Sequence, residues 1–146
     1  MRTLLTGRKM KAVDHYTIHE VGIPSLVLME RAALAVADCA LKAARAFAAH
    51  SPVWALCGVG NNGADAAAAA RMVYLKGLLA SSEEKATEEL KLQLSIARKL
   101  GIPVKKWELM KEEAENCGIL FDGLFGVGLS REIQGEYRAC MELAAE

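Results

Sequence analysis

Apolar residues are spaced in two ways along this chain, and the two spacings predict different elements. They recur every three or four positions in residues 10–21 and again in 25–48, which predicts two helices separated by a break at Pro24. Residues 53–57 and 118–122 are short, mostly apolar runs instead. Such runs are typical of strands that are buried on both faces of a parallel sheet.

The segments between these runs continue the alternation of helix and strand. Ser81 and Glu84 match a capping box, so we expect a helix to begin at Ser81. The helix over 25–48 has an alanine-rich inward face, which permits close packing. The other predicted elements are helices over 64–76 and 135–145, a strand over 104–107 and at most one helical turn over 111–115. The predicted inward residues are Leu26, Met29, Ala33, Val36, Ala40, Ala44 and Phe47 in the long helix, and Tyr137, Met141 and Ala144 in the last one.

Alternating strands and helices indicate an α/β fold, with a parallel sheet and helices on both faces. Only residues 78–80 lie between Gly77 and the helix that starts at Ser81, too few for a usual strand of about five residues. We therefore expect the strand near 78–80 to be shortened or lost. No repeat or low-complexity linker divides the 146 residues, which suit a single domain.

Composition excludes several classes of protein. Eighteen basic and eighteen acidic residues balance, which argues against binding of nucleic acid through a basic face, and aromatic residues are too few for a base-stacking surface. No apolar run approaches the ~20 residues that cross a membrane. The four cysteines form no C-x-x-C pair and fit reduced thiols, so we expect a cytoplasmic protein.

Two glycine-bearing loops follow the apolar strands. The first runs from Gly58 to Asp65 and the second from Asp122 to Glu132. In open α/β sheets, loops at the carboxyl ends of strands bind the ligand. Asparagine, aspartate and glycine at these positions favour a hydroxyl-rich, nucleotide-like ligand with a cation.

The first loop matches G-x-G-x-x-G, yet it lacks the rest of the dinucleotide fingerprint. Glu83 and Glu84 lie about 20 residues on, in a predicted helix start rather than at a strand end, and no lysine follows Gly63 as in a phosphate loop. Asp65 either interacts with the dipole of its helix, if it lies in the first turn, or faces a ligand. The asparagines before it are either turn residues or ligand contacts.

The second loop leaves similar alternatives. Asp122 either caps a turn or shares a hard cation, such as potassium, with Asn62. Ser130, Arg131 and the backbone amides of 126–132 suit a phosphate or pyrophosphate. Arg131 is otherwise a surface charge paired with a nearby glutamate.

Three motifs, in this order and spacing, resemble those of the NAD(P)H-hydrate epimerases, the YjeF amino-terminal-domain family. They are Gly22-Ile23-Pro24-Ser25 with Met29-Glu30-Arg31-Ala32, then Gly60-Asn61-Asn62-Gly63-Ala64-Asp65, then the segment from Phe121 to Arg131. The resemblance runs from Met10 to about residue 145. It implies a three-layer αβα Rossmann-like fold, in which a helical segment (10–49) precedes an α/β core (53–146).

The same resemblance implies an activity and a site. Family members interconvert the R and S forms of NADHX and NADPHX, usually as homodimers, and a fused or separate NAD(P)H-hydrate dehydratase then acts on the S form. Potassium would be bound by Asn62 and Asp122. The dinucleotide would contact Asn61, Asn62, Gly63, Ala64 and Asp65, and also Gly126, Val127, Gly128, Leu129, Ser130, Arg131 and Glu132.

The chain departs from the family in three places. Ala64 and Ala66 flank Asp65 where relatives have glycine, and their methyl groups could crowd a ligand. The strand near 78–80 is reduced. The sequence stops at Glu146, before the V-D-I-P-S-G-like stretch whose aspartate and serine complete the family's site, so C-terminal strands are expected to be absent and no catalytic residue is assigned.

These departures predict little epimerase activity for the chain as written. The alternative is a non-catalytic module of the same fold that binds a ligand or a protein. A generic Rossmann nucleotide binder is a weaker third interpretation.

Overall fold

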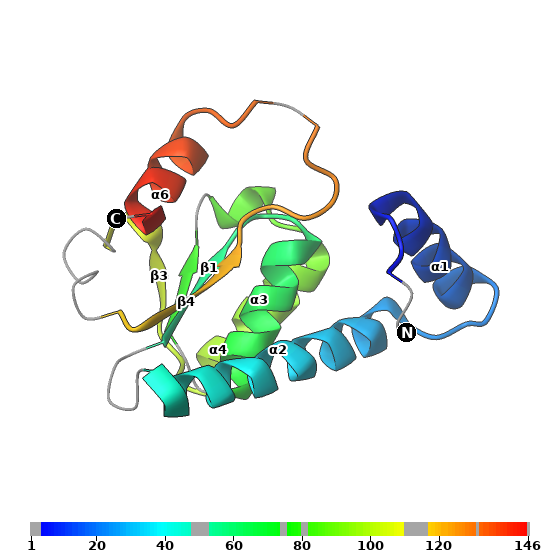
Figure 1. Cartoon of the computed structure of the whole chain (residues 1–146), viewed down its shortest axis with the longest axis horizontal. Helices are drawn as coiled ribbons and strands as arrows, with labels where there is room; N and C mark the ends of the chain where they lie inside the picture. Colours follow the sequence, from blue (N-terminus) through cyan, green and yellow to red (C-terminus); the bar gives the residue numbers. More distant parts are fainter. Residues whose placement is uncertain are drawn as a thin grey trace.

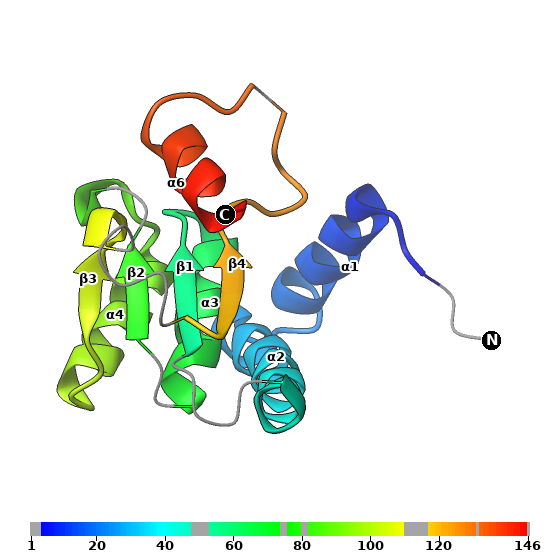
Figure 2. The same cartoon turned by 60° about the vertical axis from the view of Figure 1, so that its left-hand side comes forward.

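The computed structural model describes residues 4–47, 53–73, 76–79, 82–109, 117–130 and 132–145. In these ranges, four parallel strands form one sheet with the order β3-β2-β1-β4 (Figure 2). The strands are β1 (Val53–Cys57), β2 (Lys76–Leu79), β3 (Val104–Lys106) and β4 (Ile119–Gly123). The α-helices are α1 (Gly7–His19), α2 (Ser25–Phe47), α3 (Asn61–Met72), α4 (Glu88–Lys99) and α6 (Glu136–Ala145). The parallel α/β architecture predicted from the alternating pattern is confirmed.

Helices cover both faces of the sheet and make three layers (Figures 1 and 2). Alternate residues of β1 point to opposite faces, as in any strand. Ala55 and Cys57 are buried with α2, α3 and α4, whereas Trp54 and Leu56 are buried with Cys140 of α6. The apolar run in β1 therefore contributes buried side chains to the hydrophobic cores on both faces of the sheet.

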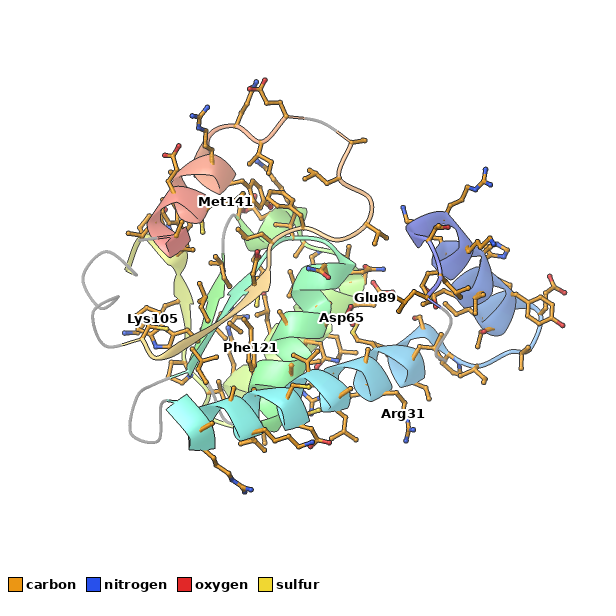
Figure 3. All side chains as sticks on the ribbon, viewed as in Figure 1. Arg31, Asp65, Glu89, Lys105, Phe121 and Met141 are labelled. Atoms are coloured by element: carbon orange, nitrogen blue, oxygen red, sulfur yellow. The ribbon has the colours of Figure 1, made fainter. Side chains whose placement is uncertain are left out.

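Small side chains let α2 and α3 approach each other closely. Ala33 of α2 is fully buried against Ala68 and Ala69 of α3. The sequence pattern placed Val36 on this face, but Val36 is 43% exposed and Ala37 is buried instead. Ala37 follows Ala33 by four positions, so it lies on the same side of the helix. The opposite side of α2 faces solvent, and Arg31 extends from it away from the sheet (Figure 3).

The observed bounds of α3 differ from the predicted ones. This helix begins at Asn61 rather than at residue 64, and it ends at Met72 rather than at residue 76. Lys76 and Gly77 belong to β2, which pairs with β1 and β3. Sheet pairing on both sides outweighs the helical propensity of this segment. The strand expected near 78–80 is present over four residues, which is the shortened form of the prediction.

The segment that follows β2 holds two short helices rather than one long one. A 3-10 helix, η1 (Glu83–Lys85), is capped by the Ser82 hydroxyl, which accepts from the Glu84 amide at 3.3 Å. Then α4 starts with Thr87, whose hydroxyl accepts from the Leu90 amide at 3.3 Å. Residue 81, the expected start of the capping box, lies outside the described residues, as do residues 110–116 with the predicted turn at 111–115.

The C-terminal end of the described chain differs in detail from its pattern. The predicted strand over 104–107 ends at Lys106, and a 3-10 helix, η2 (Trp107–Leu109), follows it. In α6 the buried residue is Cys140, whereas Met141, predicted to face inward, is 40% exposed (Figure 3). No described helix is long and apolar enough to cross a membrane.

Candidate functional site

The chain order of the strands reverses between β1 and β4. From β1 the chain passes through α3 to β2 on one side, whereas β4 pairs with β1 on the other side. In a doubly wound sheet this reversal separates the two loops that follow the strands and opens a crevice at their carboxyl ends. A cavity of about 900 Å³ lies there, lined by residues of both glycine-bearing loops.

Glycines make the first loop possible through packing. A Cβ on Gly63 would lie 1.8 Å from the carbonyl oxygen of Gly58, and a Cβ on Gly58 would lie 2.2 Å from that of Leu124. Any larger residue would force these backbone segments apart. Gly60, by contrast, has nothing within 4 Å of such a Cβ. Two of the three fingerprint glycines are therefore required by the fold itself.

Asn62 connects the two loops. Its side-chain Nδ2 donates to the carbonyl oxygen of Phe125 at 3.0 Å, and its Oδ1 lies near Gly126. Asn62 and the neighbouring Asn61 both line the cavity. The N-terminus of α3 and the loop after β4 are thus held together by one side chain that also reaches the cavity.

Asp122 lies at the end of β4, where it is paired in register with Leu56 of β1. Its Oδ1 accepts from the Leu124 amide at 2.9 Å, so this aspartate caps the turn after the strand. The turn-capping alternative is therefore observed. Asp122 is exposed, and it does not belong to the described residues that line the cavity.

The side-chain oxygens of Asn62, at the start of α3, and of Asp122, near the end of β4, are hard ligands of the kind that potassium accepts. The second carboxylate oxygen of Asp122 and Oδ1 of Asn62 are both suitable donors by chemistry. Among the described residues, no group of three or more histidine, cysteine, aspartate or glutamate side chains could hold a metal ion. A cation here would therefore depend on amide and backbone oxygens besides the single carboxylate.

Asp65 faces the cavity from the second turn of α3. Because α3 begins at Asn61, Asp65 lies beyond the first turn, where the dipole of a helix acts most strongly. Burial, and to a smaller extent the nearby negative charge of Asp14, raise the pKa of Asp65 to about 6. Figure 3 labels Asp65 on α3. Asp65 thus lines the cavity, as the ligand-facing alternative requires.

The alanines that flank Asp65 do not narrow the cavity. Ala64 is fully buried and Ala66 is 7% exposed, and both pack into the core between α3 and the sheet. Gly63 is buried as well. The crowding expected from these two methyl groups is therefore not observed, because they point into the core.

The second loop is open to solvent along most of its length. The residues from Gly126 to Ser130 are exposed and line the cavity, and the Leu129 amide donates to the Gly126 carbonyl at 3.3 Å. Glu132 lines a smaller neighbouring cavity of about 180 Å³ and accepts from the side chain of Gln134 at 3.0 Å. Arg131, the expected phosphate ligand, lies outside the described residues.

Three other elements complete the cavity wall, and the sequence pattern did not indicate them. Helix α1 contributes Lys11 and Asp14, η1 contributes Lys85, and α6 contributes Tyr137. The Tyr137 hydroxyl accepts from the Val59 amide at 3.4 Å, and its ring lies 5.2 Å from that of Phe125. No spacing rule joins residues 11, 85 and 137, so only the three-dimensional fold brings them together.

The sequence model of one family, described as "YjeF-related protein N-terminus", matches residues 25–146. The chain is 39% identical over 137 residues to an NAD(P)H-hydrate epimerase of Oenococcus oeni, which covers 90% of this chain and 63% of the relative. It is 40% identical over 139 residues to the protein of the same name in Weissella koreensis, covering 91% and 60%. The chain thus spans less than two thirds of the length of the curated relatives it matches.

The fold also has a solved counterpart. The crystal structure of the yeast protein ynu0 (YNL200c) superposes with a TM-score of 0.78 at 20% sequence identity. The match covers 97% of this chain and 64% of the yeast chain. The two proteins therefore share the three-layer fold.

Proposed function

Because the chain belongs to the family of YjeF-related protein N-termini, as its three motifs predicted, we propose that its cavity binds NADHX and NADPHX and serves the interconversion of their R and S forms. Relatives of 39% and 40% identity carry the name NAD(P)H-hydrate epimerase. These relatives are longer than this chain. We therefore infer epimerisation from the family and not from the described residues alone. For the described residues, the proposal concerns binding of the hydrated dinucleotide.

The observation that carries this proposal is the joint lining of one cavity by both glycine-bearing loops. Its volume of about 900 Å³ lies within the range of sites for small molecules and cofactors. Asn61, Asn62 and Asp65 offer amide and carboxylate groups that suit ribose hydroxyls, whereas the exposed 126–130 segment suits phosphates. Gly63 and Ala64 are buried beneath the first loop and hold its backbone in place. Arg131 and Glu132 follow the 126–130 segment in the sequence and complete the proposed phosphate-binding loop.

Potassium is a second component of the proposal. Asn62 at the start of α3 and Asp122 near the end of β4 would supply oxygen ligands, and a bound cation would offset the charge of the dinucleotide phosphates. The Leu124 amide occupies one oxygen of Asp122 and leaves the other for a cation. A melting temperature that rises more with potassium chloride than with matched lithium chloride, and that loses this difference in Asp122→Asn, would support the assignment.

The outer face of α2 supports a homodimer. Val27, Leu34 and Leu41 recur every seven residues along this face and are 49%, 47% and 44% exposed. An apolar stripe of this kind on a symmetric dimer would pack against its own copy. Sedimentation of the purified chain should show a dimer that becomes a monomer in Leu34→Lys.

The chemistry also indicates a partner activity and a compartment. A separate or fused NAD(P)H-hydrate dehydratase would consume the S form that epimerisation supplies. The described cysteines are all free thiols, which suits the reducing cytoplasm.

The test of the proposed function combines turnover with binding. Purified R-NADHX is mixed with the chain, and the appearance of the S form is followed by chromatography. A rate above the uncatalysed one that falls in Asn62→Ala would assign the reaction to this cavity. Binding of NADP⁺ without turnover would assign these residues the binding step alone. The absence of both binding and turnover would refute the proposal.

A further inference from the structure

We propose that Lys85 binds the 2′-phosphate of the dinucleotide and gives this protein a preference for NADPHX over NADHX. This inference rests on the proposed function, because it assigns one group of that substrate to one side chain. It adds a specificity that the family name, which covers both substrates, leaves open.

The first argument is the position of Lys85 in the fold. It lies in η1, on the connection that follows β2, and β2 is the direct neighbour of β1 in the sheet. In dinucleotide-binding α/β folds, a side chain at the end of the strand beside the glycine-loop strand interacts with the adenosine ribose. An acidic residue there binds the 2′-hydroxyl of NAD, whereas a nearby basic residue accommodates the 2′-phosphate of NADP. Lys85 is not at the strand end but on the connection beyond β2, and it lines the cavity together with Gly60 and Asn61.

The second argument is that the acidic candidates at this place are directed elsewhere. Glu83 accepts two hydrogen bonds from Arg98, at 2.9 and 2.6 Å, so its carboxylate is engaged with α4. Neither Glu83 nor Glu84 belongs to the described residues that line the cavity. The side chain that η1 presents to the cavity is therefore a cation.

The third argument is the charge of Lys85 itself. Within the described part of the chain, its ammonium group forms no ion pair, whereas Lys91 pairs with Glu88 at 2.8 Å and Arg98 pairs with Glu83. A phosphate dianion offers such an ammonium group strong, charge-assisted hydrogen bonds, which a ribose hydroxyl cannot match. Lys85 thus has both the charge and the freedom to bind an anion.

The backbone of η1 is fixed relative to the glycine loop. The Thr87 amide donates to the Val59 carbonyl at 2.9 Å, and the Lys85 amide donates to the Ser82 carbonyl at 3.1 Å. The Lys85 side chain consequently starts from a defined place at the edge of the cavity. Only its flexible stem must be ordered when a phosphate binds.

Calorimetric titration of the purified chain with NADP⁺ and NAD⁺ tests this assignment, because the two ligands differ only in the 2′-phosphate. We expect NADP⁺ to bind about tenfold more tightly than NAD⁺, as a single charge-assisted contact allows. Lys85→Ala should weaken NADP⁺ binding about tenfold and change NAD⁺ binding less than twofold. Lys85→Arg should keep most of the preference. Lys91→Ala, which removes an exposed lysine of α4 that does not line the cavity, is the matched control.

The outcomes separate this inference from the proposed function. Equal binding of NAD⁺ and NADP⁺, or a preference that survives in Lys85→Ala, would overturn the role of Lys85 and leave the dinucleotide site in place. Failure of both ligands to bind would also overturn the role of Lys85, and it would overturn the proposed function as well only if R-NADHX were not turned over. Adenosine 2′,5′-bisphosphate and AMP repeat the comparison without the nicotinamide half, and the same loss in Lys85→Ala is expected for the bisphosphate alone.

Discussion

The side-chain amide of Asn62 donates a 3.0 Å hydrogen bond to the carbonyl oxygen of Phe125, so a residue at the start of α3 holds the loop that follows β4. The two loops belong to strands that are adjacent in space and far apart in the sequence. Their relative position defines the width of the cavity. This contact therefore couples the stability of the fold to the shape of the proposed dinucleotide site.

Replacing Asn62 with alanine should affect stability and binding together. We expect the free energy of unfolding to fall by about 1 kcal/mol, the usual contribution of one such hydrogen bond. The increase in melting temperature on adding NADP⁺ should also be largely lost. Urea denaturation and thermal shift measure the two effects. Gln134→Ala, which removes an exposed hydrogen bond to Glu132 outside the main cavity, should leave both nearly unchanged.

The glycines of the first loop provide a matched pair of substitutions. Gly63→Ala places a Cβ 1.8 Å from a backbone oxygen, which the loop can relieve only by moving. We expect a loss of about 3 kcal/mol or an unfolded protein. Gly60→Ala meets no atom within 4 Å, and its φ of −94° suits any residue, so it should change stability by less than about 1 kcal/mol. Circular dichroism during thermal denaturation compares the two, and equal losses would contradict the packing argument.

Asp65 should make stability depend on pH. Its pKa is about 6 in the folded protein and about 3.9 in an unfolded chain, so the folded state holds the proton more strongly. The resulting stability is complete below pH 4 and is lost as the pH rises through 6. In Asp65→Asn we expect this loss to disappear, which makes the variant more stable than the parent at pH 7 by about 1 kcal/mol after screening by solvent.

Urea denaturation at pH 4 and pH 7 measures the pH effect as the difference between parent and variant, which cancels the contribution of other carboxylates. Asp14→Asn removes only the neighbouring charge and should produce a smaller change in the same direction. A parent that gains stability relative to Asp65→Asn between pH 4 and pH 7 would show that the aspartate is stabilised in its charged form.

A partly buried polar cluster joins the three helices on one face of the sheet. Gln93 of α4 is 1% exposed, accepts from Arg71 Nε of α3 at 3.0 Å, and donates to Glu30 of α2 at 3.2 Å. Arg71 and Glu30 also form an ion pair. Gln93→Leu should therefore cost about 2 kcal/mol, because it leaves partly buried charges with fewer partners. Arg138→Ala removes an exposed ion pair of α6 and should cost less than about 0.5 kcal/mol in the same urea denaturation.

Local patterns predicted the elements that their own residues determine. The runs of apolar residues located β1 and β4, and the glycine loops were located by their place after those strands. Burial on both faces explains the apolar run of β1 alone, because β4 lies at the edge of the sheet, where Ile119, Leu120 and Phe121 are only partly buried and Asp122 is exposed. Competing signals misplaced other boundaries. The sequence around Lys76 favours a helix, and only pairing with two neighbouring strands makes it β2.

The candidate site was predictable only in part, for the same reason. Asn61, Asn62 and Asp65 were identified because they lie within one motif, and the structure places all three on the cavity. Lys85 and Tyr137 belong to connections and helices whose positions depend on the whole sheet. Asp122 was recognised as a strand-end carboxylate, but the sequence could not distinguish a turn cap from a metal ligand.

Helix α1 buries none of its own residues, yet Lys11 and Asp14 form part of the cavity wall. Its described neighbours across the opening belong to the second loop, where Val127 lies close to Gly7 and Gly128 lies close to Lys11. A dinucleotide bound in the cavity would bury part of the α1 surface that is otherwise exposed. Ligand binding and the docking of the N-terminal helix would then be a single event, and proteolytic cleavage between α1 and α2 would report it.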